Sequence, residues 1–431
     1  MRTTHRRYWV FFLLFLFSGI AYLDRVNMSV AGKPIAHEFG LSPIALGYLF
    51  SSFLWAYVLM MLPGGQLIDR WGTHVVASVA VAVWSAAQMA TGMVGSFAAM
   101  LMVRLGLGVG EAPHAPVSYS TVRAWAPYTE RGTAIAAISC GSTLGLALGA
   151  PLVAWLIETL SWRWSFIITG AVGFVWVVVW AALVSTPEKT GWLPSAERDH
   201  ILAGRNAGIT PPSHNGVGYL GLIRCPAMWG LFISQGCLVY TGYLYISWLP
   251  NYLQTARHLS ILNSGVYTAI PFLISTVVGV VANWAGDRVL TTEAVRGGSR
   301  RYLVVLSLLF MAAGIAIPFV QSLAAVITLI TIAVSAAHVG PAANGALVAD
   351  LLRSPGDAGR ATAFLVLGGN TFGLLAPIVT GYVVAATGSF DAAFAAAGAL
   401  ALVGAVAALA LVRGTIGEHA RPSRASPRLV S

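Results

Sequence analysis

Charged residues are scarce in this sequence: Asp, Glu, Lys and Arg make up 9% of its 431 residues, against about 25% in an ordinary soluble domain. Hydrophobic residues make up 57%. A soluble chain of this length needs more polar side chains to cover its core, so a soluble globular protein is excluded. Apolar runs of about 20 residues, the length that crosses a bilayer as a helix, recur along the chain. They predict an all-α polytopic membrane protein.

Cysteine is also rare, and the motifs of the common enzyme classes are absent. The three cysteines, Cys140, Cys225 and Cys237, have no C-x-x-C spacing, so neither a disulfide framework nor a cysteine metal site is expected. The sequence has no HExxH, GxSxG, P-loop or dinucleotide fingerprint, and no nucleotide-binding domain of a pump. We therefore expect no enzyme activity, no catalytic residues, no metal and no cofactor.

Twelve apolar runs are candidate transmembrane helices. The first run contains Asp24 and Arg25, lacks an A-x-A cleavage site and is followed by eleven more, so it is interpreted as a retained helix rather than a signal peptide. The runs lie near residues 9–31, 45–67, 74–94, 98–121, 134–157, 163–185, 227–250, 263–286, 302–320, 323–348, 362–386 and 390–412.

The basic residues give the topology. If both termini are cytoplasmic, twenty of the 25 Lys and Arg residues fall on the inner side and only Lys33, Arg163 and Arg257 fall outside. The remaining two, Arg25 and Arg104, lie within spans. This bias follows the positive-inside rule and accounts for the net charge of +10. No basic face with interleaved aromatic residues is present, so no nucleic-acid partner is expected.

A polar, proline-containing stretch at 186–225 separates six runs from six, as a linker between two bundles would. We therefore predict an N-terminal bundle at 1–185, this cytoplasmic linker, a C-terminal bundle at 226–413 and a cytoplasmic tail at 414–431. The two halves repeat short motifs, namely Asp69-Arg70 and Asp287-Arg288 after the second and eighth spans, and Glu130-Arg131 and Gly359-Arg360 before the fifth and eleventh. Duplicated halves predict a rocking transporter rather than a channel.

The segment from Gly65 to His74 resembles the loop signature of the major facilitator superfamily, G-x-L-x-D-R-x-G-R-R/K. The matching residues are Gly65, Leu67, Asp69, Arg70 and Gly72, whereas Thr73 and His74 replace the usual basic pair. The resemblance implies two six-helix bundles and a gating or structural role for Asp69 and Arg70, repeated by Asp287 and Arg288. Such pairs can make charge and helix-dipole contacts that hold one state closed.

Within that superfamily the chain resembles the anion:cation symporter family, which includes bacterial galactonate and other sugar-acid carriers and the vesicular glutamate and sialic-acid carriers. The resemblance rests on the passages Tyr22–Asn27, Tyr57–Gly65, Arg104–Pro113 and Asn370–Gly381, and covers about 8–413. The resemblance implies roles for six residues. It makes Arg25 and Arg104 contacts of a substrate anion, Asp24 and Glu111 proton sites, and Tyr22 and Tyr57 residues of the central cavity.

The four charged residues within the spans indicate a functional site even when the family resemblance is set aside. Insertion of an ionised side chain at mid-membrane costs about 2.5–3.5 kcal/mol of free energy. A charged residue in a span is therefore expected to have a function. Arg104 and Glu111 are two helical turns apart and share a face. Guanidinium groups bind carboxylates in a planar, two-point geometry, and a buried carboxyl beside an arginine can exchange a proton as substrate binds. A buried structural ion-pair network is the alternative, which accounts for Arg104 with Asp24 but explains Glu111 less well.

Other polar residues in the spans are secondary candidates for substrate contacts. Gln235 and Tyr240 in the seventh span and Asn370 in the eleventh would form the wall opposite the charges. Asn370 is the strongest of these because an amide within the bilayer needs a partner. Each tyrosine fits a packing role nearly as well. The tenth span has Ala342–Gly345 where sugar-acid carriers tend to have hydroxyl residues and a tryptophan, which weakens the assignment to any one sugar acid.

These observations predict a proton-coupled symporter that imports a small organic anion, with a sugar acid (a hexonate or an aldarate) as the expected substrate. The proton gradient would drive it. We expect a monomer in the bacterial inner membrane with both termini in the cytoplasm. An organic-anion exchanger and a carrier of aromatic or other carboxylates are the alternatives. A drug–proton antiporter is disfavoured because export of a cation does not need two central arginines.

Overall fold

The computed structural model describes residues 5–205, 216–289 and 298–416, and these residues form helices with one isolated bridge between Leu352 and Ile416. The helices of the first half are α1 (Tyr8–Val30), α2 (Gly32–Phe39), α3 (Pro43–Thr91), α4 (Phe97–Glu111), α5 (His114–Trp125), α6 (Arg131–Thr159) and α7 (Trp162–Leu183). Two short helices follow, α8 (Ser195–Arg205) and α9 (Gly218–Ile223). The second half contains α10 (Pro226–Thr255), α11 (Ile261–Val289), α13 (Arg301–Met311), the 3₁₀ helix η2 (Ala312–Phe319), α14 (Leu323–Leu351), α15 (Ala358–Thr387) and α16 (Asp391–Leu411).

Ten described segments are long and apolar enough to cross a membrane. The two other predicted spans are also helical but differ in character. The run near 98–121 is divided into α4 and α5 at Pro113, which has no amide hydrogen to continue the helical ladder. The run near 227–250 is α10, which has 30 residues and several buried polar side chains. The predicted all-helical, membrane-spanning fold is confirmed.

The predicted boundary between the second and third spans agrees with the structure. Both runs, 45–67 and 74–94, lie in α3, whose backbone leaves helical geometry between them, at Gly72 (φ 80°, ψ 157°). That φ is accessible to glycine without the strain that a Cβ would cause. The Asp69-Arg70 pair therefore lies directly before a sharp backbone turn.

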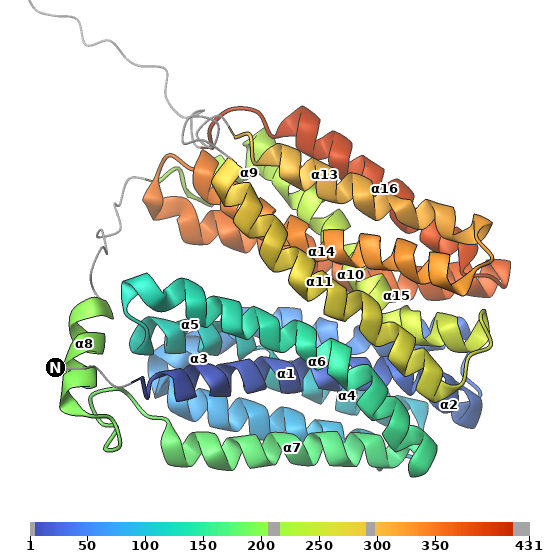
Figure 1. The fold of residues 1–431 in the computed structure, drawn as a ribbon, viewed down its shortest axis with the longest axis horizontal. Coiled ribbons are helices and arrows are strands. Elements are labelled where there is room, and N and C mark those ends of the chain that lie inside the picture. The colour runs from blue at the N-terminus through green and yellow to red at the C-terminus, as the bar shows by residue number, and fades with distance from the viewer. Residues whose placement is uncertain (1–4, 206–215, 290–297, 417–431) are drawn as a thin grey trace, which may run out of the picture.

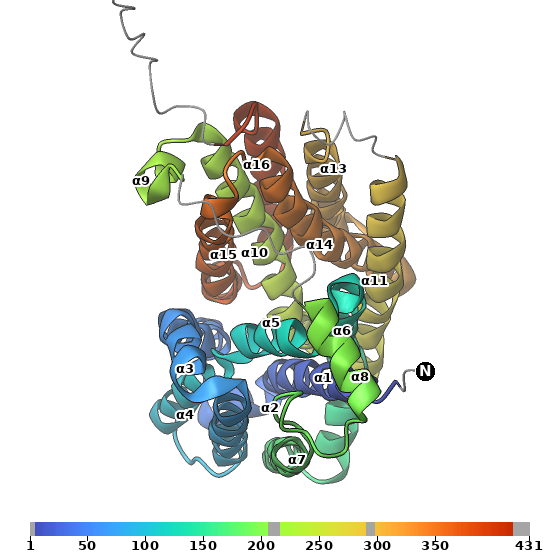
Figure 2. The same cartoon turned by 90° about the vertical axis from the view of Figure 1, so that its left-hand side faces the viewer.

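The helices form two groups, with α1–α7 on one side and α10–α16 on the other (Figures 1 and 2). We call the end that contains Arg7, Arg70 and Arg301 the basic end, and the opposite end, which contains Lys33, the Lys33 end. The groups lie close together at the Lys33 end and diverge toward the basic end (Figure 1). Along their contact, α3 packs against α15 and α6 packs against α11.

The hydrophobic cores explain this shape. One buried cluster lies within the first bundle near the basic end and includes Phe17 and Trp84. A second lies within the other bundle and includes Leu308 and Leu347. The third draws residues from both bundles at the Lys33 end, such as Phe50 of α3 packed with α10. This shared cluster holds the two bundles together at the Lys33 end. The other two clusters each lie within one bundle.

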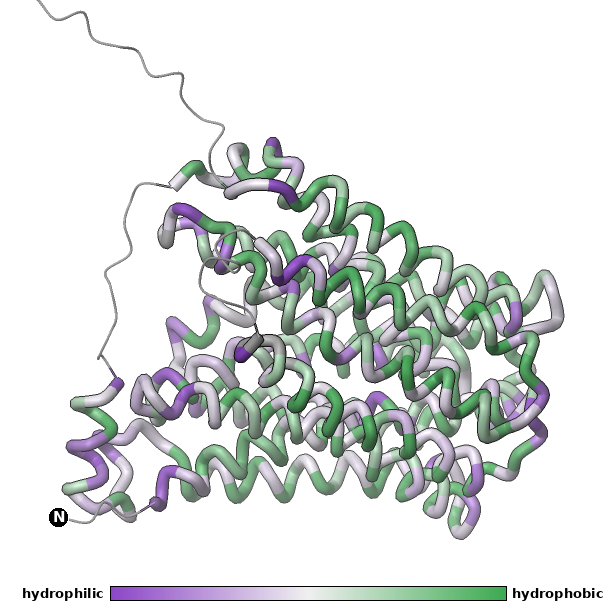
Figure 3. Tube along the Cα trace, turned by 45° about the horizontal axis from the view of Figure 1, so that its top comes forward, coloured by the Kyte–Doolittle hydropathy of each residue, from purple (hydrophilic) through white to green (hydrophobic). Residues whose placement is uncertain are grey.

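The outer surface suits a bilayer. Apolar residues follow the lengths of the helices, whereas hydrophilic residues gather at their ends (Figure 3). Large apolar side chains that are more than half exposed include Leu148, Val175, Val178, Val277 and Val406. In hydrocarbon these side chains meet an apolar solvent, and the helices satisfy their own backbone hydrogen bonds.

At the basic end, α8 is tied to the first bundle by ion pairs. The carboxylate of Glu197 accepts hydrogen bonds from the backbone amides of Arg6 and Arg7 and from the Arg7 side chain. Arg7 also donates to both carboxylate oxygens of Glu130, at 2.8 and 2.7 Å. These hydrogen bonds hold the pKa of Glu130 below its usual value. The start of the first helix is thus fixed to the connection between the two halves.

Candidate functional site

Four charged residues meet inside the first bundle. Asp24 and Arg25 lie on α1, and Arg104 and Glu111 lie on α4. Asp24 and Glu111 are fully buried, Arg104 is 1% exposed and Arg25 is 8% exposed. Buried charges require partners or a function, because removing them from water is costly. This cluster is the strongest candidate site in the described residues.

Arg25 pairs with Glu111 across the two helices. Its Nε and Nη2 atoms both donate to Oε2 of Glu111, at 3.0 and 2.8 Å. The second carboxylate oxygen, Oε1, is buried and has no hydrogen-bond partner among the described residues. Glu111 is therefore paired through one oxygen and retains an unused acceptor.

Among the described residues, Asp24 and Arg104 have more buried polar atoms without hydrogen bonds than Arg25 and Glu111 have. Both carboxylate oxygens of Asp24, and Nε and Nη1 of Arg104, are buried without hydrogen-bond partners in the described ranges. Ion pairs within 4.0 Å in this part of the chain do not include one between Asp24 and Arg104. The structural alternative from the sequence, which pairs these two residues directly, therefore has no direct contact to support it here.

Aromatic side chains surround the two guanidinium groups. The Arg25 guanidinium lies over the rings of Tyr22, Phe53 and Tyr57, at 4.6, 5.2 and 5.6 Å from their centroids. The Arg104 guanidinium lies 5.0 Å from the same Phe53 ring. Such cation–π contacts stabilise a desolvated cation without neutralising it. Tyr22 and Tyr57, which were predicted from the sequence, thus lie beside Arg25. Phe53 also lies beside it and was not predicted.

The second bundle reaches this cluster through Tyr243 of α10. Arg25 Nη1 lies 3.4 Å from the Tyr243 hydroxyl, so Tyr243 connects this charged cluster to the second bundle. A Cβ at Gly373 of α15 would lie 2.8 Å from the Tyr243 ring, so glycine there allows the close approach. Sequence analysis missed Tyr243 because three tyrosines at 240, 243 and 245 share one helix and only the helix rotation distinguishes them.

The space beside the arginines is small. A cavity of about 10 Å³ is lined by Arg25, Phe53, Arg104, Tyr243 and Ser247. A single water molecule needs roughly 10–15 Å³ of such volume. An organic anion can therefore reach both arginines only when the bundles move apart or when side chains rearrange.

The remaining predicted substrate contacts lie elsewhere in the second bundle. The side-chain carbonyl of Gln235 accepts a hydrogen bond from Asn344 at 3.1 Å, so its amide group is engaged within the bundle. Tyr240 packs in the core shared by the bundles. Asn370 contacts Met61 Sδ at 3.9 Å across the interface. The described contacts of these three residues do not include Arg25 or Arg104. Asn344, within the tenth-span segment that departs from sugar-acid carriers, is a polar residue that sequence analysis did not select.

The predicted gating residues lie at the basic end. Asp69 and Arg70 are exposed, next to the turn at Gly72. Arg288 lies over the Trp284 ring at 4.4 Å, and the side chain of Asp287 lies outside the described residues. Hydrogen bonds between the bundles occur at the other end, where Ser29 donates to Ser247 and Lys33 to Gln254. The gating roles of the two Asp-Arg pairs remain predictions.

Comparisons with known proteins decide the family. The model of the Major Facilitator Superfamily matches residues 14–295. A probable galactarate/D-glucarate transporter of Bacillus subtilis (strain 168) is 30% identical, over 95% of this chain and 93% of that protein. The chain belongs to the major facilitator superfamily. The predicted membership is confirmed, and the names of the family and its members are those of transporters rather than enzymes.

Further comparisons agree. A D-galactonate transporter of Escherichia coli O6:H1 (strain CFT073) is 30% identical, over 94% of this chain and 96% of that protein. Among solved structures, a bacterial homologue of the human lysosomal transporter Spinster superposes with a TM-score of 0.74 at 19% identity, covering 95% of this chain and 97% of that one. This likeness shows the fold, which is that of the superfamily.

Proposed function

We propose that this transporter is a proton-coupled symporter that imports a sugar acid, a hexonate or an aldarate, by alternating access between its two bundles. The relatives named for galactarate, D-glucarate and D-galactonate transport support this substrate class. We further propose that the protein lies in a bacterial inner membrane with the basic end toward the cytoplasm, as its arginine distribution favours. The described conformation, closed at the Lys33 end, then corresponds to the inward-facing state.

One observation supports coupling above all others: two arginines and two carboxyl groups are buried together, and only one charge pair is made. With both acids ionised the cluster has no net charge, so a substrate carboxylate adds an uncompensated negative charge. Protonation of Asp24 or Glu111 leaves an arginine available for that carboxylate. Proton binding and anion binding therefore favour each other, and this reciprocity is what symport requires.

Each member of the cluster has a role in this scheme. Arg104 has two unsatisfied donors and binds the carboxylate in a planar contact. Arg25 exchanges its Glu111 partner for substrate when Glu111 gains a proton. Asp24 and Glu111 are the proton sites, and Tyr22, Tyr57 and Tyr243 offer hydroxyl groups to the sugar chain. The Arg25–Tyr243 contact transmits the state of the cluster to the other bundle.

Uptake into liposomes tests the proposal directly. Purified protein is reconstituted, an inward proton gradient is imposed, and labelled D-galactonate, D-glucarate and galactarate are offered in turn. We expect accumulation above equilibrium that stops when an ionophore dissipates the gradient. Accumulation that ignores the gradient and requires an anion preloaded inside would instead favour an organic-anion exchanger. Absence of uptake of any sugar acid, with aromatic carboxylates transported, would contradict the substrate class.

A further inference from the structure

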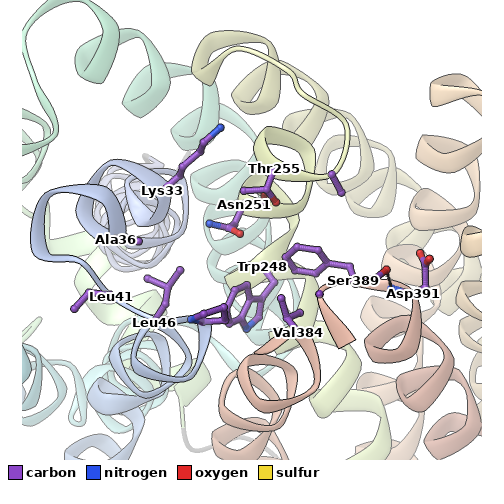
Figure 4. A pocket seen from close by; sticks show the side chains of 14 residues that line it. Lys33, Ala36, Leu41, Leu46, Trp248, Asn251, Thr255, Val384, Ser389 and Asp391 are labelled. Atoms are coloured by element: carbon purple, nitrogen blue, oxygen red, sulfur yellow. Dashed lines mark hydrogen bonds between the residues drawn. The ribbon is translucent and has the colours of Figure 1, made fainter. Parts of the chain in front are cut away.

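A second polar cavity lies at the Lys33 end, outside the central cluster. It has a volume of about 330 Å³ and is formed by α2 and α3 of the first bundle and by α10, α15 and the start of α16. Its polar lining consists of Lys33, Asn251, Thr255, Ser389 and Asp391, with Trp248 and Leu46 at its base (Figure 4). Small-molecule pockets begin at about 300 Å³, so a compact ligand fits.

This cavity and the central one lie on the same path. Leu46 and Trp248 line the cavity at the Lys33 end, whereas Phe50, one turn along α3, and Ser247 of α10 line the small central cavity. The rings of Phe50 and Trp248 meet edge to face between them, with centroids 5.1 Å apart. Ser29 also donates a hydrogen bond to the Ser247 carbonyl at 2.8 Å. These contacts join opposite bundles, so movement of the bundles would open the path.

Lys33 is the only basic residue among those that line the cavity, and it also connects the two bundles. Its ammonium donates to the carbonyl of Gln254 at 3.0 Å, in the last turn of α10. An ammonium has three donors, so two remain for a ligand, and Lys33 is exposed. The Gln254 side chain donates in return to the Val30 carbonyl at 3.3 Å, so α10 is connected both to α2 and to the end of α1.

The lining has the chemistry of a hydroxylated carboxylate. A lysine ammonium is a point charge that attracts a carboxylate in several orientations, as a first contact requires. Asn251, Thr255 and Ser389 can hydrogen-bond hydroxyl groups, and the Asp391 carboxylate accepts them but opposes a second anionic group placed beside it. Lys33 and Asp391 lie on opposite sides of the cavity in Figure 4. A ligand with its carboxylate at one end and hydroxyls along its chain satisfies both sides.

We propose that this cavity is a separate docking site for the sugar acid on the Lys33 face, occupied before the anion reaches Arg25 and Arg104. This inference rests on the proposed function, since it concerns the same substrate class. A docked carboxylate competes with the Gln254 carbonyl for the Lys33 ammonium. Binding at the surface therefore weakens a bond that holds the Lys33 end closed, and arrival of substrate favours opening toward it.

The chain contains only one other lysine, Lys189, which lies at the basic end and provides a matched control. Lys33→Met removes the charge and keeps the length, Lys33→Arg keeps the charge, and Lys189→Met repeats the first change on the opposite face. An exposed charge pair is worth about 0.2–1 kcal/mol, which corresponds to about a 1.4- to fivefold effect. We expect the KM for uptake to rise by this factor in Lys33→Met, with kcat little changed, and to be unchanged in Lys189→Met. Lys33→Arg should restore most of the loss.

Chemical labelling separates docking from transport. In sealed vesicles with the Lys33 face outward, a membrane-impermeant amine reagent is applied and modification of Lys33 is measured by peptide mass spectrometry. We expect D-galactonate to slow the labelling and the neutral hexitol sorbitol to leave it unchanged. Protection should persist in Arg104→Ala, because docking does not require the central arginine.

Two results would overturn docking while the proposed function stands: Lys33→Met with wild-type KM, or transport by the wild type without protection of Lys33. Protection that disappears in Arg104→Ala would also overturn it, since the effect would then come from the central site. Protection without transport of any sugar acid would support the docking site and contradict the proposed symport.

Discussion

Arg25 and Glu111 are joined through a single carboxylate oxygen: both Nε and Nη2 of Arg25 donate to Oε2 of Glu111, and Oε1 accepts nothing among the described residues. A side-by-side pair would have used both oxygens. The geometry leaves one oxygen of Glu111 available for a proton while the other keeps its arginine. It also leaves Arg25 committed to Glu111 and Tyr243 until one of them is displaced.

Replacement of Arg25 by lysine tests this geometry. Lysine retains the charge, but its compact ammonium cannot make the two donations to Glu111 and the contact with Tyr243 in one plane. We expect Arg25→Lys to lose transport by about tenfold or more, measured as initial proton-driven uptake of D-galactonate. Arg163→Lys, which alters an arginine paired with Glu38 at the surface, should remain near the wild type. Unaltered transport by Arg25→Lys would contradict a planar contact.

Arg104 should be required both for substrate binding and for stability. It is buried beside two carboxyl groups and balances part of their charge, and removal of one charged member from such a buried group costs about 3–5 kcal/mol. We therefore expect Arg104→Met to lower the midpoint of thermal unfolding and to abolish the stabilisation that D-galactonate gives the wild type. Arg104→Ala should also lose binding. Wild-type affinity in either folded variant would contradict a substrate contact.

Tyr243 should matter more than its neighbour Tyr240. Tyr243→Phe removes the hydroxyl that contacts Arg25, whereas Tyr240→Phe alters a tyrosine in the same helix without that contact. A hydrogen bond to a charged group contributes about 1.5–3 kcal/mol. We expect a loss of transport of about tenfold in Tyr243→Phe and a change within twofold in Tyr240→Phe. The reverse order would favour Tyr240, the assignment made from the sequence.

Much of the fold could be predicted from the sequence because bilayer physics leaves few choices. Length and hydropathy located the spans, and the cost of intramembrane charge singled out Asp24, Arg25, Arg104 and Glu111. The break between α4 and α5 was missed because hydropathy does not register the lost amide hydrogen of Pro113.

Side-chain partners were harder to predict, since helix rotation and the approach of distant helices decide them. The structural alternative considered from the sequence paired Arg104 with Asp24, whereas in the structure Arg25 contacts Glu111. Gln235 accepts a hydrogen bond from Asn344 of α14, a partner that the sequence did not indicate, and its expected contact with the substrate stays a prediction. The cavity around Lys33 depends on five helices brought together by the closure of the bundles, so no local pattern indicates it.

The link between α8 and the first bundle should be sensitive to acid. Arg7 lowers the pKa of Glu130 from its usual value of 4.5, so the ionised form stabilises the folded state above that value, and the contribution disappears as pH falls through the lowered pKa. We expect Glu130→Gln to cost about 1 kcal/mol near neutral pH. Thermal unfolding midpoints of variant and wild type should converge as the pH falls through this lowered pKa. Glu188→Gln, which affects an exposed pair with Arg205, should cost less. A difference that persists in acid would contradict the role of ionised Glu130.

Proton coupling predicts that transport and exchange can be separated at Glu111. Glu111→Gln fixes this site in a neutral form that resembles the protonated acid, so it cannot release a proton inside. We expect pH-driven accumulation of D-galactonate to fail in this variant, while exchange of labelled for unlabelled substrate survives because exchange does not require proton release. Both are measured in the same liposomes, with Glu38→Gln as a surface control. Full accumulation by Glu111→Gln would remove Glu111 from the proton path and leave Asp24 as the sole carrier.

The number of protons follows from the response to voltage. If Asp24 and Glu111 both carry protons, the monoanion D-galactonate moves with one net positive charge, which gains about 2.3 kcal/mol per 100 mV of inside-negative potential. That energy corresponds to about a 50-fold change in the accumulation ratio. The dianion D-glucarate would move with two protons and no net charge, so its accumulation at fixed pH should not respond to the potential. The two substrates, compared in liposomes with the potential clamped by potassium and valinomycin, thus serve as controls for each other. Accumulation of D-galactonate that does not change with voltage would mean one proton per monoanion, and one of the two acids would then serve only to hold an arginine in place.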